Sequence, residues 1–160
     1  MRAEFVNPFV QATCDVVRLT MGTEPKLGSL SARPKIFTAT EFNVSCGIVG
    51  DLVGGVLYGL SSETAYSVAK QMLGGMEEIP DELSTSALAE LGNMISGNTS
   101  SKLQALGFVC DITPPSIIRG TNISISTIDI PALVIPIELG AHGSLEITVS
   151  LKERAAVKAA

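Results

Sequence analysis

Residues 82–107 read ELSTSALAELGNMISGNTSSKLQALG, and this stretch decides the fold. Its apolar residues recur at intervals of three and four, which is the spacing of one face of an α-helix. Ile79-Pro80-Asp81 leads into the first turn, and Gly107 is a helix stop signal. The pattern therefore predicts one long helix over 82–106. Its apolar stripe consists of Leu83, Ala87, Leu91, Met94 or Ile95, Leu103 and Leu106.

Two further helices are predicted before the long one. Residues 4–21 carry apolar side chains at helical spacing and end at Gly22, a typical stop signal. The segment Ser61-Ser62-Glu63-Thr64 can cap a helix that runs over 62–73 and is ended by two glycines. Between these helices, residues 23–34 contain glycine and proline and are predicted to form a loop.

The remaining segments have the character of β-strands. Gly50-Asp51 joins two of them as a hairpin signal, and Pro136 indicates a strand edge or a bulge. Apolar and polar residues alternate over 145–151, so we expect one face of that strand to be exposed to solvent. The predicted strands are 36–40, 42–49, 53–60, 108–112, 123–128, 132–139 and 145–151.

Length and composition indicate one domain with its own hydrophobic core. The chain has 160 residues, of which 46% are hydrophobic. No apolar run reaches the roughly 18 residues that span a bilayer. The segment Met1-Arg2-Ala3-Glu4 lacks the apolar core of a signal peptide. We therefore expect a cytoplasmic protein without membrane insertion.

Charge and metal-ligating residues exclude several classes of function. The net charge is −5, and basic residues gather only in the last ten positions, which argues against nucleic-acid binding. The widely separated Cys14, Cys46 and Cys110 indicate neither a disulfide framework nor a zinc site, and we expect them to be buried. His142 is the single histidine and lies in a turn, where we expect it to be solvated. No metal site is therefore predicted.

The long helix carries a second stripe, which is polar. Ser86, Glu90, Asn93 and Gly97 are spaced i, i+4, i+7 and i+11, so they lie on one face beside the apolar stripe. Gly97 and Gly92 each cost about 1 kcal/mol of helix stability relative to alanine. Such glycines mark the close approach of another backbone, either of a binding partner or of a neighbouring element of the same fold. The spacing alone leaves both readings open.

These residues carry a family resemblance. Ser86, Glu90 and Asn93 resemble the Asp/Ser-x3-Glu-x2-Asn signature of the CheC/CheX/FliY phosphatases of bacterial chemotaxis. Residues 89–98 as a whole resemble the active helix of that family, and the resemblance covers about residues 1–152. It extends to Asn7-Pro8-Phe9 and to Val134-Ile135-Pro136-Ile137 followed by Gly140.

Two details refine the resemblance. CheC-like members carry the signature twice, whereas the helix over 62–73 has no Glu-x2-Asn, which favours a CheX-like protein. Family members also carry a proline some distance after the asparagine. Here Pro114 and Pro115 come slightly early and Ser116 follows, which indicates a small loop deletion.

The resemblance implies a protein phosphatase of bacterial chemotaxis that hydrolyses the aspartyl phosphate of a CheY-like response regulator. Asn93 would position the attacking water, and Glu90 would pair with a lysine of the regulator. Ser86, Gly97 and Asn98 are candidates for contact with that partner. The chain would hold no cofactor of its own, because Mg2+ is expected in the active site of the regulator. The alternatives are a non-catalytic receiver-binding module of CheX-like fold and a phosphatase of a receiver outside chemotaxis.

The resemblance also sets the expected architecture. It implies an α+β, sandwich-like fold in which the long active-site helix and two further helices pack on an antiparallel or mixed sheet. Residues 1–152 would form a single CheX-like domain, and residues 153–160 a fraying tail rich in alanine. A single signature implies a homodimer, and the many strand-like segments suit a dimer formed through sheet edges.

Overall fold

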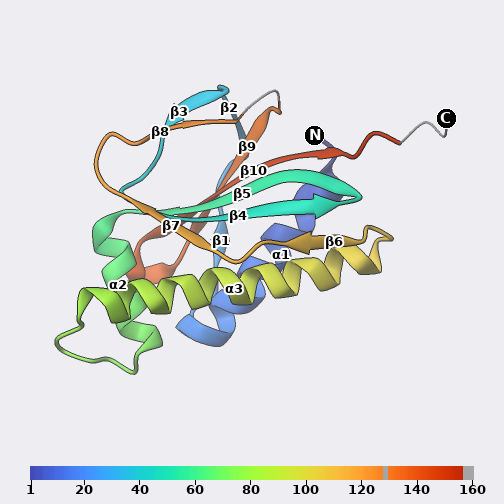
Figure 1. Cartoon of the computed structure of the whole chain (residues 1–160). Helices are drawn as coiled ribbons and strands as arrows, with labels where there is room; N and C mark the ends of the chain where they lie inside the picture. The colour runs from blue at the N-terminus through green and yellow to red at the C-terminus, as the bar shows by residue number, and fades with distance from the viewer. Residues whose placement is uncertain (128–129, 157–160) are drawn as a thin grey trace.

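The computed structural model describes residues 1–127 and 130–156. In this part of the chain, helices α1 (Ala3–Met21), α2 (Ser62–Met72) and α3 (Asp81–Ala105) pack beneath a large antiparallel sheet (Figure 1). The α+β prediction is confirmed. The long helix begins and ends within one residue of the predicted bounds, because apolar periodicity and Gly107 define it well.

The large sheet has the strand order β1-β9-β10-β5-β4-β6, with β2 also pairing with β9 and β7 with β4. Each of these pairs is antiparallel. The predicted hairpin at Gly50-Asp51 joins β4 to β5. The strands are β1 (Lys26–Leu27), β2 (Ser31–Arg33), β4 (Phe42–Gly50), β5 (Leu52–Leu60), β6 (Cys110–Ile112), β7 (Ser116–Arg119), β9 (Ala132–Glu138) and β10 (Ser144–Glu153).

The main hydrophobic core lies between this sheet and the helices. Successive residues of a strand point to opposite faces, and alternate residues of β10 are directed to the helices. Phe9 of α1, Leu88 of α3 and Ile147 of β10 are all fully buried there. Burial of this apolar surface fixes the three helices on one face of the sheet.

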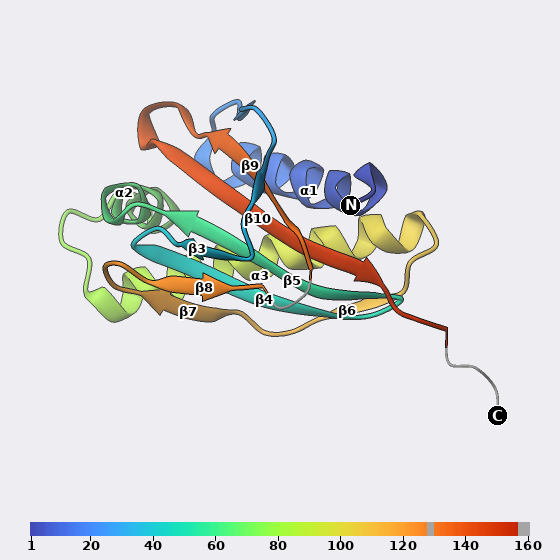
Figure 2. The same ribbon diagram turned by 90° about the horizontal axis from the view of Figure 1, so that it is seen from above.

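A two-stranded ribbon of β3 (Ile36–Thr38) and β8 (Ser124–Ser126) lies over the other face of the sheet (Figures 1 and 2). This ribbon makes one prediction wrong. Thr148 and Ser150 were expected to be exposed, but their residues are only 4% and 7% exposed. Ser150 Oγ donates to the carbonyl oxygen of Ile130 at 3.1 Å. Hydroxyl side chains tolerate this burial because they find such partners.

Three short strands were not predicted from the sequence. β1 and β2 occupy part of the expected loop 23–34, and β7 follows the two prolines. Each has at most four residues, so its conformation depends on pairing with a longer strand rather than on local propensity.

Pro136 lies in β9, between the residues that pair with β2 and the residues that pair with β1. Its carbonyl oxygen accepts from the Gly28 N–H at 2.8 Å, on the side away from β10. The missing N–H of the proline faces the same side, so it removes no hydrogen bond from the β9–β10 pair.

Two predicted segments extend in part outside the described residues. They are the strand 123–128, of which β8 covers the middle, and the tail 153–160. The domain boundary and the fraying of the tail stay predictions. In the described part of the chain, no helix combines the length and apolarity needed to cross a membrane.

Candidate functional site

The site is built on α3, which is held by polar contacts at both ends. Its first turn has no side-chain cap. Instead, Arg119 of β7 donates to Asp81 Oδ2 at 2.8 Å and to Thr85 Oγ1 at 3.4 Å. The Arg119 guanidinium also lies 5.5 Å from the centre of the Phe42 ring. Sequence reasoning missed Arg119, because its role depends on the unpredicted strand β7.

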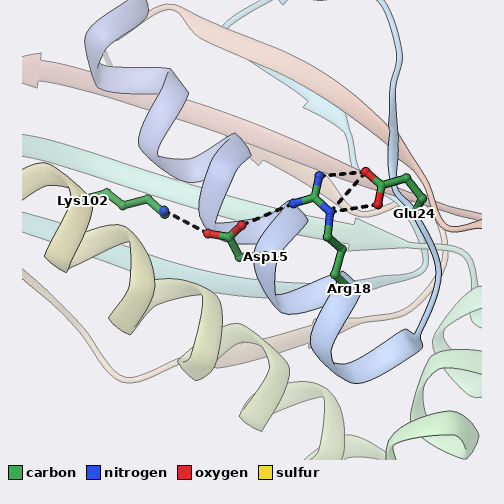
Figure 3. Close-up of polar contacts among 4 residues, drawn as sticks. All are labelled: Asp15, Arg18, Glu24 and Lys102. Carbon is green, nitrogen blue, oxygen red and sulfur yellow. Dashed lines mark hydrogen bonds and ion pairs between the residues drawn. The ribbon is translucent and has the colours of Figure 1, made fainter.

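The other end of α3 is joined to α1 by a chain of ion pairs (Figure 3). Lys102 Nζ lies 2.9 Å from Asp15 Oδ2, and Asp15 Oδ1 lies 3.4 Å from Arg18 Nη1. Arg18 in turn binds Glu24 through two nitrogens, at 2.8 Å and 3.0 Å. This bidentate bond raises the pKa of Arg18 and lowers the pKa of Glu24. These ion pairs therefore link α3, α1 and the segment that leads into β1.

Between these two attachments, α3 presents the predicted polar stripe. At about 100° per residue, Ser86, Glu90, Asn93 and Gly97 fall within about 60° of the helix circumference. All four are exposed. Asn98 is also exposed, but it lies about 80° beyond Glu90, on the flank of the helix that carries Lys102. The structure thus places four of the five predicted site residues together and sets Asn98 apart.

Glu90 and Asn93 are free to act on something outside the chain. Neither side chain makes a hydrogen bond or an ion pair with the described residues. Their Cβ atoms are about 5–6 Å apart, as expected for residues three apart on a helix. A carboxylate and a carboxamide therefore stand side by side on a convex surface, with acceptor and donor atoms directed outward.

The two interior glycines of α3 have different surroundings. Gly92 is buried, and a Cβ built there would lie 2.6 Å from Val44 Cγ1 of β4 and 3.8 Å from Pro115 Cβ. A Cβ at Gly97 would meet nothing within 4 Å. Of the two readings that the sequence left open, packing within the fold therefore accounts for Gly92 and leaves Gly97 unexplained.

Pro115 is the early proline that departs from the family pattern. A Cβ at Gly92 would lie within contact distance of Pro115, so Pro115 lies beside α3. Gly92 directly precedes Asn93 in the helix. Pro115 therefore packs against the buried side of α3, and the loop deletion stays a prediction. Sequence spacing could identify the departure but not this contact.

Other groups with chemical potential are buried or engaged elsewhere. Burial raises the pKa of the Cys14 and Cys46 thiols, and Ser96 Oγ donates to Cys46 Sγ at 3.5 Å. Burial also raises the pKa of the Tyr58 phenol. The three cysteines are buried, as predicted, and none of them forms a disulfide. Buried structural thiols of this kind are inert rather than nucleophilic.

His142 differs from the expectation of a solvated residue. It lies in the predicted turn, which forms a 3-10 helix over Gly140–His142, but it is half-buried. Its Nδ1 lies 2.7 Å from Ser67 Oγ of α2. His142 thereby joins α2 to the connection between β9 and β10. Among the described residues, no group of three or more histidine, cysteine or acidic side chains could hold a metal ion.

A cavity of about 610 Å³ is lined by residues of the β3–β8 ribbon and of the sheet face opposite α3. Its walls include Phe37, Leu57, Ile125, Thr148 and Ser150, and its lining residues are uncharged. It is therefore separated from Glu90 and Asn93 by the sheet. Neither this cavity nor the smaller one beside α1 and the end of α3 is lined by residues of the polar stripe.

Comparison with known proteins identifies the class. Residues 42–138 match the family model described as chemotaxis phosphatase CheX. The chain is 36% identical over 153 residues to the CheY-P phosphatase CheX of Thermotoga maritima, covering 95% of this chain and 98% of that protein.

Solved structures agree with this match. A chemotaxis protein CheX from Desulfovibrio desulfuricans has a TM-score of 0.82 and 26% identity, covering 94% of this chain and 99% of that one. The CheX–CheY–BeF3–Mg2+ complex from Borrelia burgdorferi has a TM-score of 0.78 and 30% identity, covering 95% and 100%. The chain belongs to the chemotaxis phosphatase CheX family. The expectation of a CheX-like enzyme, a phosphatase and hydrolase, is thereby confirmed.

Proposed function

We propose that this protein hydrolyses the aspartyl phosphate of a CheY-like response regulator in bacterial chemotaxis. The observation that carries the proposal is the unpaired Glu90–Asn93 couple on a helix held at both ends. Two exposed side chains on the outer face of a helix do not enclose a small substrate, but they suit insertion into the active site of another protein. The relative from Thermotoga maritima is a CheY-P phosphatase, which supports the same substrate class.

Asn93 acts by placing the nucleophile. Phosphoryl transfer passes through a loose transition state, so catalysis consists mainly of positioning and charge stabilisation. The carboxamide of Asn93 offers both a donor and an acceptor to a water molecule in line with the leaving oxygen. A carboxamide is not a useful base near neutral pH. Its contribution is therefore the orientation of the water.

Glu90 acts mainly in docking. Its exposed carboxylate pairs with the lysine of the receiver's active site and keeps α3 in register. The charge of the transition state is stabilised by that lysine and by Mg2+ held in the receiver, so this chain needs no metal. The related complex that contains CheY, BeF3 and Mg2+ supports this division. Ser86 and Gly97 complete the contact surface, and Asn98 would touch only the border of the partner.

The protein is proposed to act as a cytoplasmic homodimer. The sheet ends at the short strands β1 and β2, beyond which no further strand pairs among the described residues. Leu27 of β1 and Leu30, which lies between β1 and β2, are 57% and 58% exposed. A symmetric contact through this edge would cover them and extend the sheet.

The test is dephosphorylation of a CheY from the same organism after loading with acetyl phosphate. Asn93→Ala should slow the catalysed reaction by about a hundredfold or more while the fold survives. Glu90→Ala should weaken binding as well as rate. Gln104→Ala, at an exposed position about three turns beyond Asn93 along α3, is the matched control and should leave the rate unchanged.

The alternatives give different results in the same assay. A non-catalytic module would bind the activated receiver without accelerating phosphate release. A phosphatase outside chemotaxis would act on another receiver and not on CheY. If Asn93→Ala and Glu90→Ala both dephosphorylate CheY at the wild-type rate, the assignment of the site is wrong.

A further inference from the structure

Helix α3 contains two interior glycines, and packing within the protein explains Gly92 but not Gly97. Gly97 has no positive φ angle, and a side chain built on it would enter open space. Glycine lowers the stability of a helix interior because it loses more backbone entropy than other residues. An exposed position that would accept alanine without a clash therefore keeps a residue that costs the helix about 1 kcal/mol relative to alanine.

The position of Gly97 relative to Asn93 suggests what the missing side chain is for. The two residues are four apart, so Gly97 lies about 6 Å further along the helix axis and about 40° round it. Asparagine has a short side chain, and any water that it holds lies close to the helix backbone. Atoms of the receiver around the phosphoryl group must therefore approach α3 closely, directly beside residue 97.

We infer that Gly97 is a specificity-determining residue, against which the segment of the receiver next to its phosphorylated aspartate packs in direct contact with the backbone of α3. This inference rests on the proposed function and deepens it. The receivers that fit are those in which this segment projects far enough to reach the helix surface. A side chain at position 97 holds the receiver away from Asn93 and Glu90 together, so its first effect is on binding.

The experiment compares Gly97→Ala and the larger Gly97→Gln with wild type. Both replacements favour the helix, so the thermal midpoint should rise, by about 2–4 °C for alanine. The KM for phosphorylated CheY should rise about tenfold for alanine and further for glutamine. Titration with CheY activated by BeF3 and Mg2+ should give weaker binding in the same order. Gly92→Ala is the matched control for stability, since the same change on the buried face should lower the midpoint.

The outcomes separate this inference from the proposed function. Wild-type KM and affinity in both Gly97 variants overturn the inference and leave the phosphatase assignment intact. A lowered thermal midpoint for Gly97→Ala also overturns it, because the glycine would then serve the fold. If the wild-type protein binds activated CheY but does not hydrolyse it, the proposed function fails, and the binding titration still decides the role of Gly97.

Discussion

Replacing Gly92 by alanine tests how closely α3 approaches the sheet. The new Cβ would lie 2.6 Å from Val44 Cγ1, well inside van der Waals contact. Val44 is 1% exposed, and its branched side chain has little freedom at χ1, so the methyl group cannot simply turn away. We expect α3 to move outward from β4, together with the stripe that it carries.

The free energy of unfolding should fall despite a gain in helix propensity. Alanine stabilises a helix interior by about 1 kcal/mol relative to glycine. Overpacking of a filled core costs about 1–3 kcal/mol. The balance is a loss of up to about 2 kcal/mol. The assay is urea denaturation followed by far-ultraviolet circular dichroism, because the chain has no tryptophan.

Shortening the opposing side chain provides the matched control. Val44→Ala alone should be destabilising, since it removes buried methyl groups. In the double variant the two smaller side chains fit together, so the combined loss should be at least about 1 kcal/mol smaller than the sum of the single losses. Strict additivity, or a Gly92→Ala protein more stable than wild type, would refute the close approach.

Two further predictions concern the ends of the sheet and of α3. Light scattering should give twice the mass of one chain, and Leu30→Asp should shift the protein towards half that mass; a wild-type monomer would contradict the proposed dimer. Arg119→Met removes the bonds to Asp81 and Thr85 at the uncapped start of α3. Since these groups are partly exposed, stability should change by less than about 1 kcal/mol. The kcat/KM for phosphorylated CheY should nevertheless fall about fivefold. An unchanged kcat/KM would exclude Arg119 as a positioning residue.

Much of the fold could be predicted because its principal elements have strong local signals. The bounds of α1 and α3 follow from helical periodicity and from glycine stops, and the β4–β5 hairpin from Gly50-Asp51. The strands β1, β2 and β7 have no such signal, because they exist only through pairing with longer neighbours. The same applies to Thr148, which alternation placed in solvent and a distant ribbon covers.

The candidate site divides in the same way. The spacing of Glu90 and Asn93 was sufficient to place them together on an exposed face, and the family resemblance supplied the chemistry. The contrast between Gly92 and Gly97 was not available from the sequence, because it depends on what lies opposite each position. Arg119 was missed for the same reason, since its partners are far away in the chain.

The convex shape of the α3 stripe has a consequence for selectivity in the cell. Two side chains on the outside of a helix do not surround a metabolite, so abundant phosphoesters and nucleotides gain no residence time there. On the proposed mechanism, hydrolysis occurs only while the two proteins are joined, and each supplies the part that the other lacks. Such an arrangement lets a phosphatase work at high concentration without draining the phosphorylated small molecules around it.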